Sequence, residues 1–341
     1  MKICVYGICL NEEKFASRWL TTATEADIIV VGDTGSTDGT KGILRACDKV
    51  VLYDVSVTPF RFDTARNTIL NLIPPDVDLC ISLDFDEYFD KGWRENLEKT
   101  WQPGTTRTKY KYQWSENPSD YLLDADKIHT RFDYFWRNPV HEVLQIKSSA
   151  AESFSISDFK MYHNGDYTKS SRNQYRKLLE LSYEENRNDL QVLFWYGRTL
   201  FFENNPKCVE ILKEFLDLGG TNIERASVMW CISKFEKTEY WLKNSLLVMK
   251  NYPTAWVELM KYYYSIQNWF EYIQTYELYE HISPQRTYLD DNYPAEIVYD
   301  MASIAYTNLG NKEKAIISCE KAILLNPEDL RLKNNLLFFA V

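Results

Sequence analysis

The chain has 341 residues, is 45% hydrophobic and 26% charged, and carries a formal net charge of −10. That length predicts two domains, since a single hydrophobic core stops growing near ~250–300 residues, and the acidic balance argues against a basic nucleic-acid-binding protein. No apolar run approaches the ~18 residues of a membrane span, and the N-terminus lacks the pattern of a secretory signal, so we expect a soluble, cytoplasmic protein.

Strands and helices alternate in the first part of the chain. Short β-rich runs end near residues 8, 31, 55 and 83, and residues 37–47 and 63–72 have the spacing of helices. The runs are continuously apolar, which is typical of a parallel sheet with helices on both faces. From residue 105 to about residue 163 the pieces are β-rich without helices, so we expect a mixed or antiparallel extension of the sheet.

The chain beyond residue 167 is helical by its spacing. Its last segment, "VYDMASIAYTNLGNKEKAIISCEKAILLNPED", resembles a tetratricopeptide repeat, a helix pair with small and aromatic packing positions and a terminal proline. The matching residues are Tyr306, Leu309, Gly310, Ala315, Ala322 and Pro327. We therefore expect domains at 1–166 and 167–341, the second built from three or four stacked helix pairs.

A glycine-rich turn, "VVGDTGSTDGT" at residues 30–40, joins the second predicted strand to a helix. It contains no Gly-Lys-Ser/Thr and no GxGxxG, which excludes a Walker loop and a dinucleotide fingerprint. Ligands of open parallel sheets bind beyond the carboxyl ends of the strands, where this turn lies. Its leading acid, Asp33, favours a hydrogen bond to a base or a ribose over a phosphate cradle.

A second acidic turn, Asp84-Phe85-Asp86-Glu87, follows the strand that ends at residue 83. Two carboxylates this close repel each other unless a cation neutralises them. A hard ion such as Mg²⁺ or Mn²⁺, bridging to a diphosphate, does so. The alternative is a helix N-terminus that merely carries acids.

Four stretches in this order, "CLNEE", "VVGDTGSTDGT", "FRFDTARN" and "LDFDEYF", resemble the nucleotide-sugar half of family 2 glycosyltransferases over roughly residues 1–165. The resemblance implies an α/β, GT-A fold, Rossmann-like with a mostly parallel sheet. With the helical part it resembles the subgroup that carries a C-terminal tetratricopeptide extension. The expected fold is thus a GT-A domain followed by an all-α repeat domain.

The resemblance implies a donor-binding role for three residues near the first two strands. Asp33 matches the acid that hydrogen-bonds the nucleobase, usually uracil. The backbone near Gly7 and the side chain of Glu12 match the lining of the nucleoside pocket. Gly32 departs from a common second acid at that position, which leaves the identity of the base open.

The resemblance also assigns the acidic turn. Asp84 matches the first acid of a DxD motif, on the ribose side, and Asp86 matches the second, a direct metal ligand. Arg66 matches an arginine that meets a phosphate or holds the acidic cluster. His163, in "MYHNG", matches a late histidine that completes the coordination of Mn²⁺ or Mg²⁺.

The base of such an enzyme comes from the β-rich part, where "WRNPVHEVL" (136–144) resembles a "G-x-VHE" element. Glu142 would be the base, and His141 would assist or orient it, since histidine is the usual proton acceptor near neutral pH. A single displacement at the anomeric carbon needs such a base and a metal for the departing diphosphate.

The implied function is a metal-dependent, inverting transfer of a sugar from a nucleotide sugar, UDP-sugar first among them. The expected acceptor is a protein, a peptide or a saccharide, with a modified DNA base less favoured. Two alternatives stay open: a catalytically degenerate nucleotide-sugar-binding and repeat-interaction protein, and a nucleotidyltransferase. The last normally begins with a glycine-rich, basic loop, which "YGICLNEEKF" does not supply.

Overall fold

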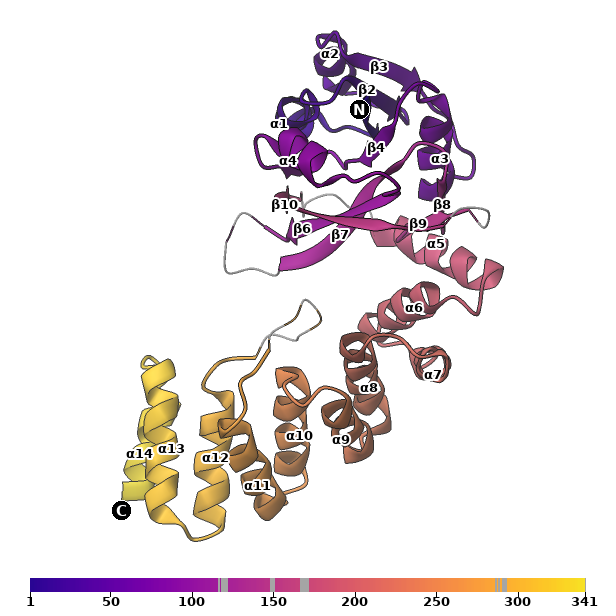
Figure 1. The fold of residues 1–341 in the computed structure, drawn as a ribbon. Helices are drawn as coiled ribbons and strands as arrows, with labels where there is room; N and C mark the ends of the chain where they lie inside the picture. The colour runs from indigo at the N-terminus through magenta and orange to yellow at the C-terminus, as the bar shows by residue number, and fades with distance from the viewer. Residues whose placement is uncertain are drawn as a thin grey trace. The chain divides into compact units, whose positions relative to one another are not determined.

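A computed structural model describes residues 1–115, 117, 122–147, 151–165, 172–285, 287, 289 and 293–340. The chain forms two compact units, Met1–Glu185 and Asn186–Val341 (Figure 1). The boundary expected after residue 166 lies outside the described residues. Helix α5 (Arg172–Glu185), which the sequence assigned to the helical domain, groups with the first unit.

The first half of the main sheet is parallel, as the apolar runs predict. The strand order is β3-β2-β1-β4, and each neighbouring pair is parallel. These strands are β1 (Ile3–Cys9), β2 (Ile28–Asp33), β3 (Val50–Asp54) and β4 (Leu79–Ser82). Their carboxyl ends lie at one edge, where both acidic turns begin.

The second half of the sheet is mixed, which confirms the expected extension. It continues from β4 in the order β7-β6-β10-β5, with antiparallel pairs β4–β7, β7–β6 and β10–β5 and a parallel pair β6–β10. The strands are β5 (Glu87–Phe89), β6 (Arg107–Gln113), β7 (Leu122–Thr130) and β10 (Phe154–His163). With four parallel pairs of seven, this is a mixed α/β fold, and no finer fold class follows from it.

Helices cover both faces of the sheet because side chains of β1 alternate between two hydrophobic clusters. Ile3 and Val5 belong to a cluster with Trp19 and Trp93. Cys4 and Tyr6 belong to the opposite cluster. Helices α1 (Glu13–Ala23), α2 (Thr40–Arg45) and α4 (Trp93–Thr100) contribute to the first cluster, and α3 (Phe62–Leu72) with the hairpin β8 (Tyr134–Arg137) and β9 (Val143–Ile146) to the second.

The second unit is helical in its described residues. Neighbouring helices pack in sequence order as four pairs followed by a last helix, within the expected three or four pairs. They are α6 (Leu190–Phe202), α7 (Cys208–Leu218), α8 (Asn222–Glu236), α9 (Glu239–Val248), α10 (Pro253–Ser265), α11 (Trp269–Glu280), α12 (Ile297–Asn308), α13 (Lys312–Leu325) and α14 (Leu330–Ala340).

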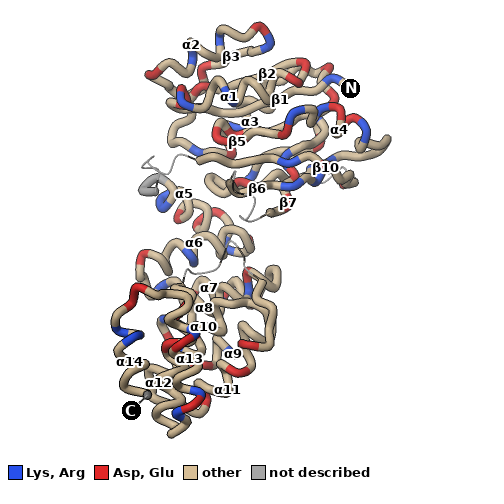
Figure 2. Tube along the Cα trace, turned by 90° about the vertical axis from the view of Figure 1, so that its left-hand side faces the viewer, with Lys and Arg blue, Asp and Glu red and all other residues tan. Residues whose placement is uncertain are grey.

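Charges of both signs are mixed along the traces of both units (Figure 2), as the modest net charge of −10 suggests. In the part of the chain that the structure describes, no helix is long and apolar enough to cross a membrane.

Candidate functional site

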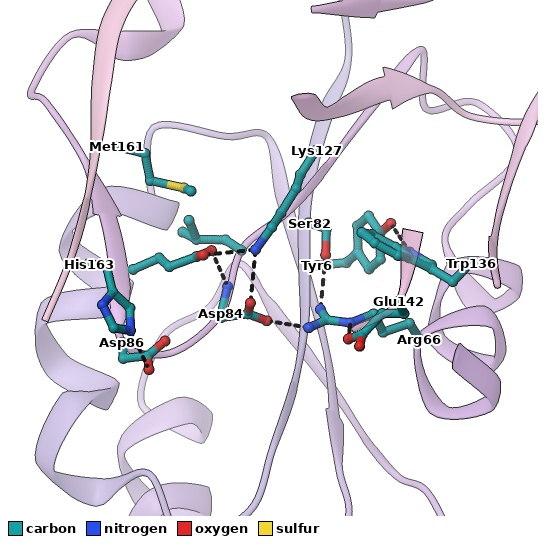
Figure 3. A network of polar contacts seen from close by, with 12 residues as sticks. Tyr6, Arg66, Ser82, Asp84, Asp86, Lys127, Trp136, Glu142, Met161 and His163 are labelled. Atoms are coloured by element: carbon teal, nitrogen blue, oxygen red, sulfur yellow. Dashed lines mark hydrogen bonds and ion pairs between the residues drawn. The ribbon is translucent and has the colours of Figure 1, made fainter. Parts of the chain in front are cut away.

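The acidic turn after β4 is the best-defined polar cluster of the first unit (Figure 3). Strand β4 is wholly buried, and the chain turns at Asp84 into the short strand β5. Strand β5 pairs with β10 so that Glu87 lies opposite His163. This register brings a histidine 77 residues away to Asp86, with His163 Nε2 3.2 Å from Asp86 Oδ2.

Arg66 of α3 joins two carboxylates at the centre of the cluster. Its Nη2 donates to Asp84 Oδ1 at 2.6 Å and its Nε donates to Glu142 Oε1 at 2.5 Å. The guanidinium also donates to the Ser82 hydroxyl at 3.1 Å, and Arg66 is only 6% exposed. The sequence-predicted Arg66, Asp84 and Glu142 therefore lie together, with the arginine between the two acids.

Lys127 of β7 supplies the second cation. Its ammonium donates to Asp84 Oδ2 at 2.9 Å and to Glu87 Oε1 at 2.8 Å. Burial alone would raise the pKa of Asp84, but the adjacent Arg66 and Lys127 outweigh it and hold that pKa well below its usual range. Burial raises the pKa of Glu87, and Lys127 only partly offsets this.

His163 is held on both ring nitrogens. Its Nδ1 lies 3.3 Å from the Trp114 carbonyl oxygen, and its Nε2 faces Asp86. Burial lowers the pKa of His163, but the hydrogen bond and charge of Asp86 reverse the direction and raise it. A Cβ at Gly165 would come within 2.7 Å of the imidazole, so a larger residue there would displace this ring.

Asp86 and His163 can supply two ligands to a cation. Among the described residues, no group of three or more His, Cys, Asp or Glu side chains is arranged to hold a metal ion. Asp84 is already occupied by Arg66 and Lys127. The described residues therefore do not form a closed protein metal site, and an ion such as Mg²⁺ or Mn²⁺ at Asp86 and His163 would need further ligands from outside the protein.

A buried chain of hydrogen-bonded side chains packs against Arg66. The guanidinium lies 5.1 Å from the ring centre of Trp136, whose indole N–H donates to the Tyr6 hydroxyl at 2.8 Å. Tyr6 in turn lies 3.0 Å from His129 Nε2, and His129 Nδ1 lies 2.8 Å from the Thr130 carbonyl oxygen. Burial lowers the pKa of His129 to about 3, which favours the neutral ring.

Sequence reasoning missed Lys127, Tyr6, Trp136 and His129 as parts of this cluster. Tyr6 and Trp136 begin two of the segments quoted above, and Lys127 and His129 lie in β7, but only the folding of the chain brings the four residues near the acidic turn. A lysine and a histidine at buried positions of β-rich segments were the available signals, and neither indicates a partner.

Asp33, the predicted base-binding acid, points into its own turn. Its Oδ1 accepts from the backbone N–H of Gly35 at 3.0 Å and of Ser36 at 2.8 Å, and Lys41 lies 3.2 Å away. Burial opposes ionisation, but these hydrogen bonds lower the pKa of Asp33. The residue is 1% exposed, so the structure gives it a role in fixing the turn. Its contact with a nucleobase stays a prediction.

The glycines next to this turn are required by close packing. A Cβ at Gly7 would lie 2.6 Å from the Leu83 carbonyl oxygen, and a Cβ at Gly32 would lie 2.5 Å from Ile69. An acid at position 32 would have to displace the Ile69 side chain. Glu12, at the start of α1, donates its backbone N–H to the Thr40 hydroxyl at 2.8 Å. The nucleoside contacts expected of Gly7 and Glu12 stay predictions.

His141 and Glu142 lie in the loop between β8 and β9. The loop is tied to α3 by the Phe62 N–H, which donates to the Pro139 carbonyl oxygen at 3.0 Å. His141 is exposed and has a left-handed backbone, with φ of 49°. Only Glu142 turns toward the acidic cluster, and there it is paired with Arg66.

Comparison with known proteins gives weak likenesses to solved structures, each over about half of the chain. No protein-family model and no curated protein matches the chain. Among solved structures, MamA has 18% identity and a TM-score of 0.39, covering 49% of this chain and 99% of its own. YrrB, described as a tetratricopeptide-repeat protein with an unusual peptide-binding site, has 15% identity and a TM-score of 0.39, covering 48% and 84%. PilF of Pseudomonas aeruginosa has 15% identity and a TM-score of 0.37, covering 48% and 72%.

The expected membership of the family 2 glycosyltransferases is wrong by these comparisons. No family model matches, the structural neighbours they name are tetratricopeptide-repeat proteins, and no glycosyltransferase is among those named. Four short motifs in a plausible order were not enough, because glycine-rich and acidic turns follow strands in many α/β folds.

Proposed function

We propose that the first unit binds a nucleotide sugar, UDP-sugar first among them, with a divalent cation, and transfers the sugar to an acceptor nucleophile. The proposal rests on one observation: at the carboxyl edge of the sheet His163 Nε2 lies 3.2 Å from Asp86 Oδ2, two residues after Asp84. The acceptor would be a protein, a peptide or a saccharide.

The residues of the cluster would have separate roles in binding the metal, binding the donor and accepting the proton. Asp86 and His163 would hold Mn²⁺ or Mg²⁺, which would neutralise the departing diphosphate. Arg66 and Lys127 keep Asp84 ionised and fixed, so that it can accept a hydrogen bond from a ribose hydroxyl. Glu142, with His141 beside it, would take the acceptor proton once its ion pair with Arg66 loosens.

A second candidate is a binding protein without turnover. The ion pair of Glu142 with Arg66 at 2.5 Å favours it, since the guanidinium occupies the carboxylate that would have to take up the acceptor proton. In this case the first unit would bind a nucleotide sugar only, and the helical unit would carry a protein-interaction function.

Calorimetry with UDP, with and without Mn²⁺, tests the site itself. Wild-type protein is expected to bind UDP in a Mn²⁺-dependent manner, and Asp86→Asn is expected to lose that dependence because it removes a ligand. Asp124→Asn is the matched control, since Asp124 lies in β7 of the same unit and its side chain is 66% exposed. Absence of Mn²⁺-dependent UDP binding by the wild type would refute both candidates.

Release of UDP from a panel of UDP-sugars separates the two candidates. Glu142→Gln keeps the shape of the side chain and removes its basicity. It is expected to bind UDP like the wild type while turnover falls ~10²–10⁴-fold, the usual contribution of a general base. Wild-type binding without release from any donor would support the second candidate.

A further inference from the structure

The second unit contains an apolar groove between α9 and α11. Helix α10 forms its floor, and its cavity volume is about 630 Å³, within the range of small-ligand and side-chain pockets. The apolar lining consists of Leu246, Leu247, Trp256, Leu259, Tyr263 and Leu278. All of these residues belong to the second unit.

The two walls of the groove expose leucines. Leu247 of α9 is 83% exposed and Leu278 of α11 is 60% exposed, whereas Trp256 and Leu259 on the floor are 6% and 4% exposed. A partner side chain that enters between the two exposed leucines and covers the aromatic floor removes apolar surface from water, which favours binding. Such patches commonly mark interaction sites.

The lining of the groove also contains three charged residues, Lys243, Lys250 and Glu271. The Trp256 indole N–H donates to the Lys250 carbonyl oxygen at 2.6 Å, which places this residue beside the aromatic floor. Among the described residues, no carboxylate forms an ion pair with the Lys250 ammonium. Lys243, also in the lining, is instead paired with Glu239 at 3.1 Å.

The neighbouring groove, between α11 and α13 over α12, has a different chemistry. Its cavity volume is about 370 Å³, and ion pairs cross it: Lys314 to Glu277 at 2.7 Å and Lys321 to Glu280 at 2.6 Å. The Tyr306 hydroxyl also donates to Glu277 at 3.0 Å. The same helix arrangement is thus closed by its own charges in one repeat and left open in the other.

We infer that the groove between α9 and α11 binds a protein segment that carries a large apolar side chain next to a carboxylate. The apolar side chain lies on Trp256 and Leu259 between the two exposed leucines. The carboxylate of the segment forms an ion pair with the Lys250 ammonium, which has no ion-pair partner among the described residues. This binding surface is independent of the nucleotide site of the first unit.

A random-sequence peptide display library, selected against the full chain, tests the inference. Enriched peptides are expected to combine Leu, Phe or Trp with a neighbouring Asp or Glu. Their affinity, measured by fluorescence anisotropy, is expected to fall about 10-fold in Lys250→Glu, as for a lost charge pair at an interface. Leu278→Ser is expected to weaken binding by a similar factor, because it removes an apolar wall.

Lys321→Glu is the matched control in the closed groove, and it is expected to leave affinity within about twofold. Lys250→Gln, which only removes the charge, guards against a folding defect and should give a smaller loss than Lys250→Glu. No enrichment, enrichment of peptides without acids, or equal losses in the Lys250 and Lys321 variants would each overturn the inference.

Discussion

The two acidic turns of the first unit satisfy their carboxylates in different ways. Asp33, after β2, accepts hydrogen bonds from residues two and three positions ahead and pairs with Lys41. Asp84, after β4, depends on Arg66 and Lys127, which are 18 and 43 residues away. The Asp33 carboxylate is thus held mainly by its own turn, whereas the Asp84 carboxylate is held by distant elements. The first turn as a whole also bonds to the segment after β1, where Asn11 Oδ1 accepts from the Thr37 N–H at 2.8 Å.

This difference indicates which turn is suited to chemistry. A carboxylate saturated by its own backbone and 1% exposed mainly fixes local structure. A cluster in which Arg66 and Lys127 face Asp84, Glu87 and Glu142 keeps several charges close together, and Asp86 beside it remains 34% exposed in its side chain. The predictions below test whether the Asp84 carboxylate depends on distant partners and the Asp33 carboxylate does not.

The largest effect is expected for Arg66→Met. The substitution leaves Asp84 and Glu142 without their shared cation, and breaking a buried ion pair from one side costs about 3–5 kcal/mol in unfolding free energy. Urea denaturation, monitored by hydrogen exchange of the amides in β1 and β4, measures this loss of unfolding free energy. Arg61→Met is the control, since Arg61 also pairs with acids but is 25% exposed in its side chain, and its loss should stay near 1 kcal/mol or less. Equal losses would contradict the distinction.

A pH effect is expected from His129, which supports Arg66 through Tyr6 and Trp136. Its folded-state pKa of about 3 lies below the usual value, so the unfolded chain binds an extra proton as the pH falls below about 6.5. This group should therefore remove about 3 kcal/mol of stability between pH 7 and pH 4. His129→Gln cannot take up that proton, and its stability curve should be flatter by that amount. Parallel curves for the two proteins would show that the histidine does not stay neutral.

A smaller loss, about 2 kcal/mol at pH 7, is expected for Lys127→Met, because Asp84 and Glu87 then keep their charges with one partner fewer. The pKa of Glu87, already raised by burial, should rise further. The deficit should shrink as the pH is lowered through that pKa, since a protonated Glu87 no longer needs the ammonium. Denaturation of the wild type and of Lys127→Met at pH 7 and pH 5 measures this stability deficit. A deficit that grows on acidification would contradict the prediction.

The smallest effect is expected for Asp33→Asn. The amide oxygen still accepts from the Gly35 and Ser36 N–H groups, so only the charge and the contact with Lys41 are lost, at about 1 kcal/mol. The depressed pKa of Asp33 means that its contribution is present above about pH 4 and is lost as the pH falls through the folded-state pKa. Thermal unfolding at pH 7 measures the loss. A destabilisation as large as that of Arg66→Met would erase the contrast between the turns.

The sequence predicted much of the architecture of the first unit. Its apolar runs located β1 to β4, and the change of pattern after residue 105 predicted the mixed extension. It did not reveal that α5 packs with this unit. Phe62 and Tyr175 stack with ring centres 5.7 Å apart, and Arg61 binds Glu185. Such contacts between distant aromatic and charged residues leave no periodic signal.

The sequence by itself determined the elements, the placement of acids at strand ends and the pairing of helices in the second unit, because each depends on residues close together in the chain. The tertiary structure decided which charges meet. Strand order brought Lys127 and His163 to the acidic turn, and helix α3 placed Arg66 between Asp84 and Glu142. It also decided that one groove of the helical unit is closed by ion pairs while the next is open. Pairing across a sheet or between stacked helices joins residues tens of positions apart, and local patterns of hydrophobicity carry no record of it.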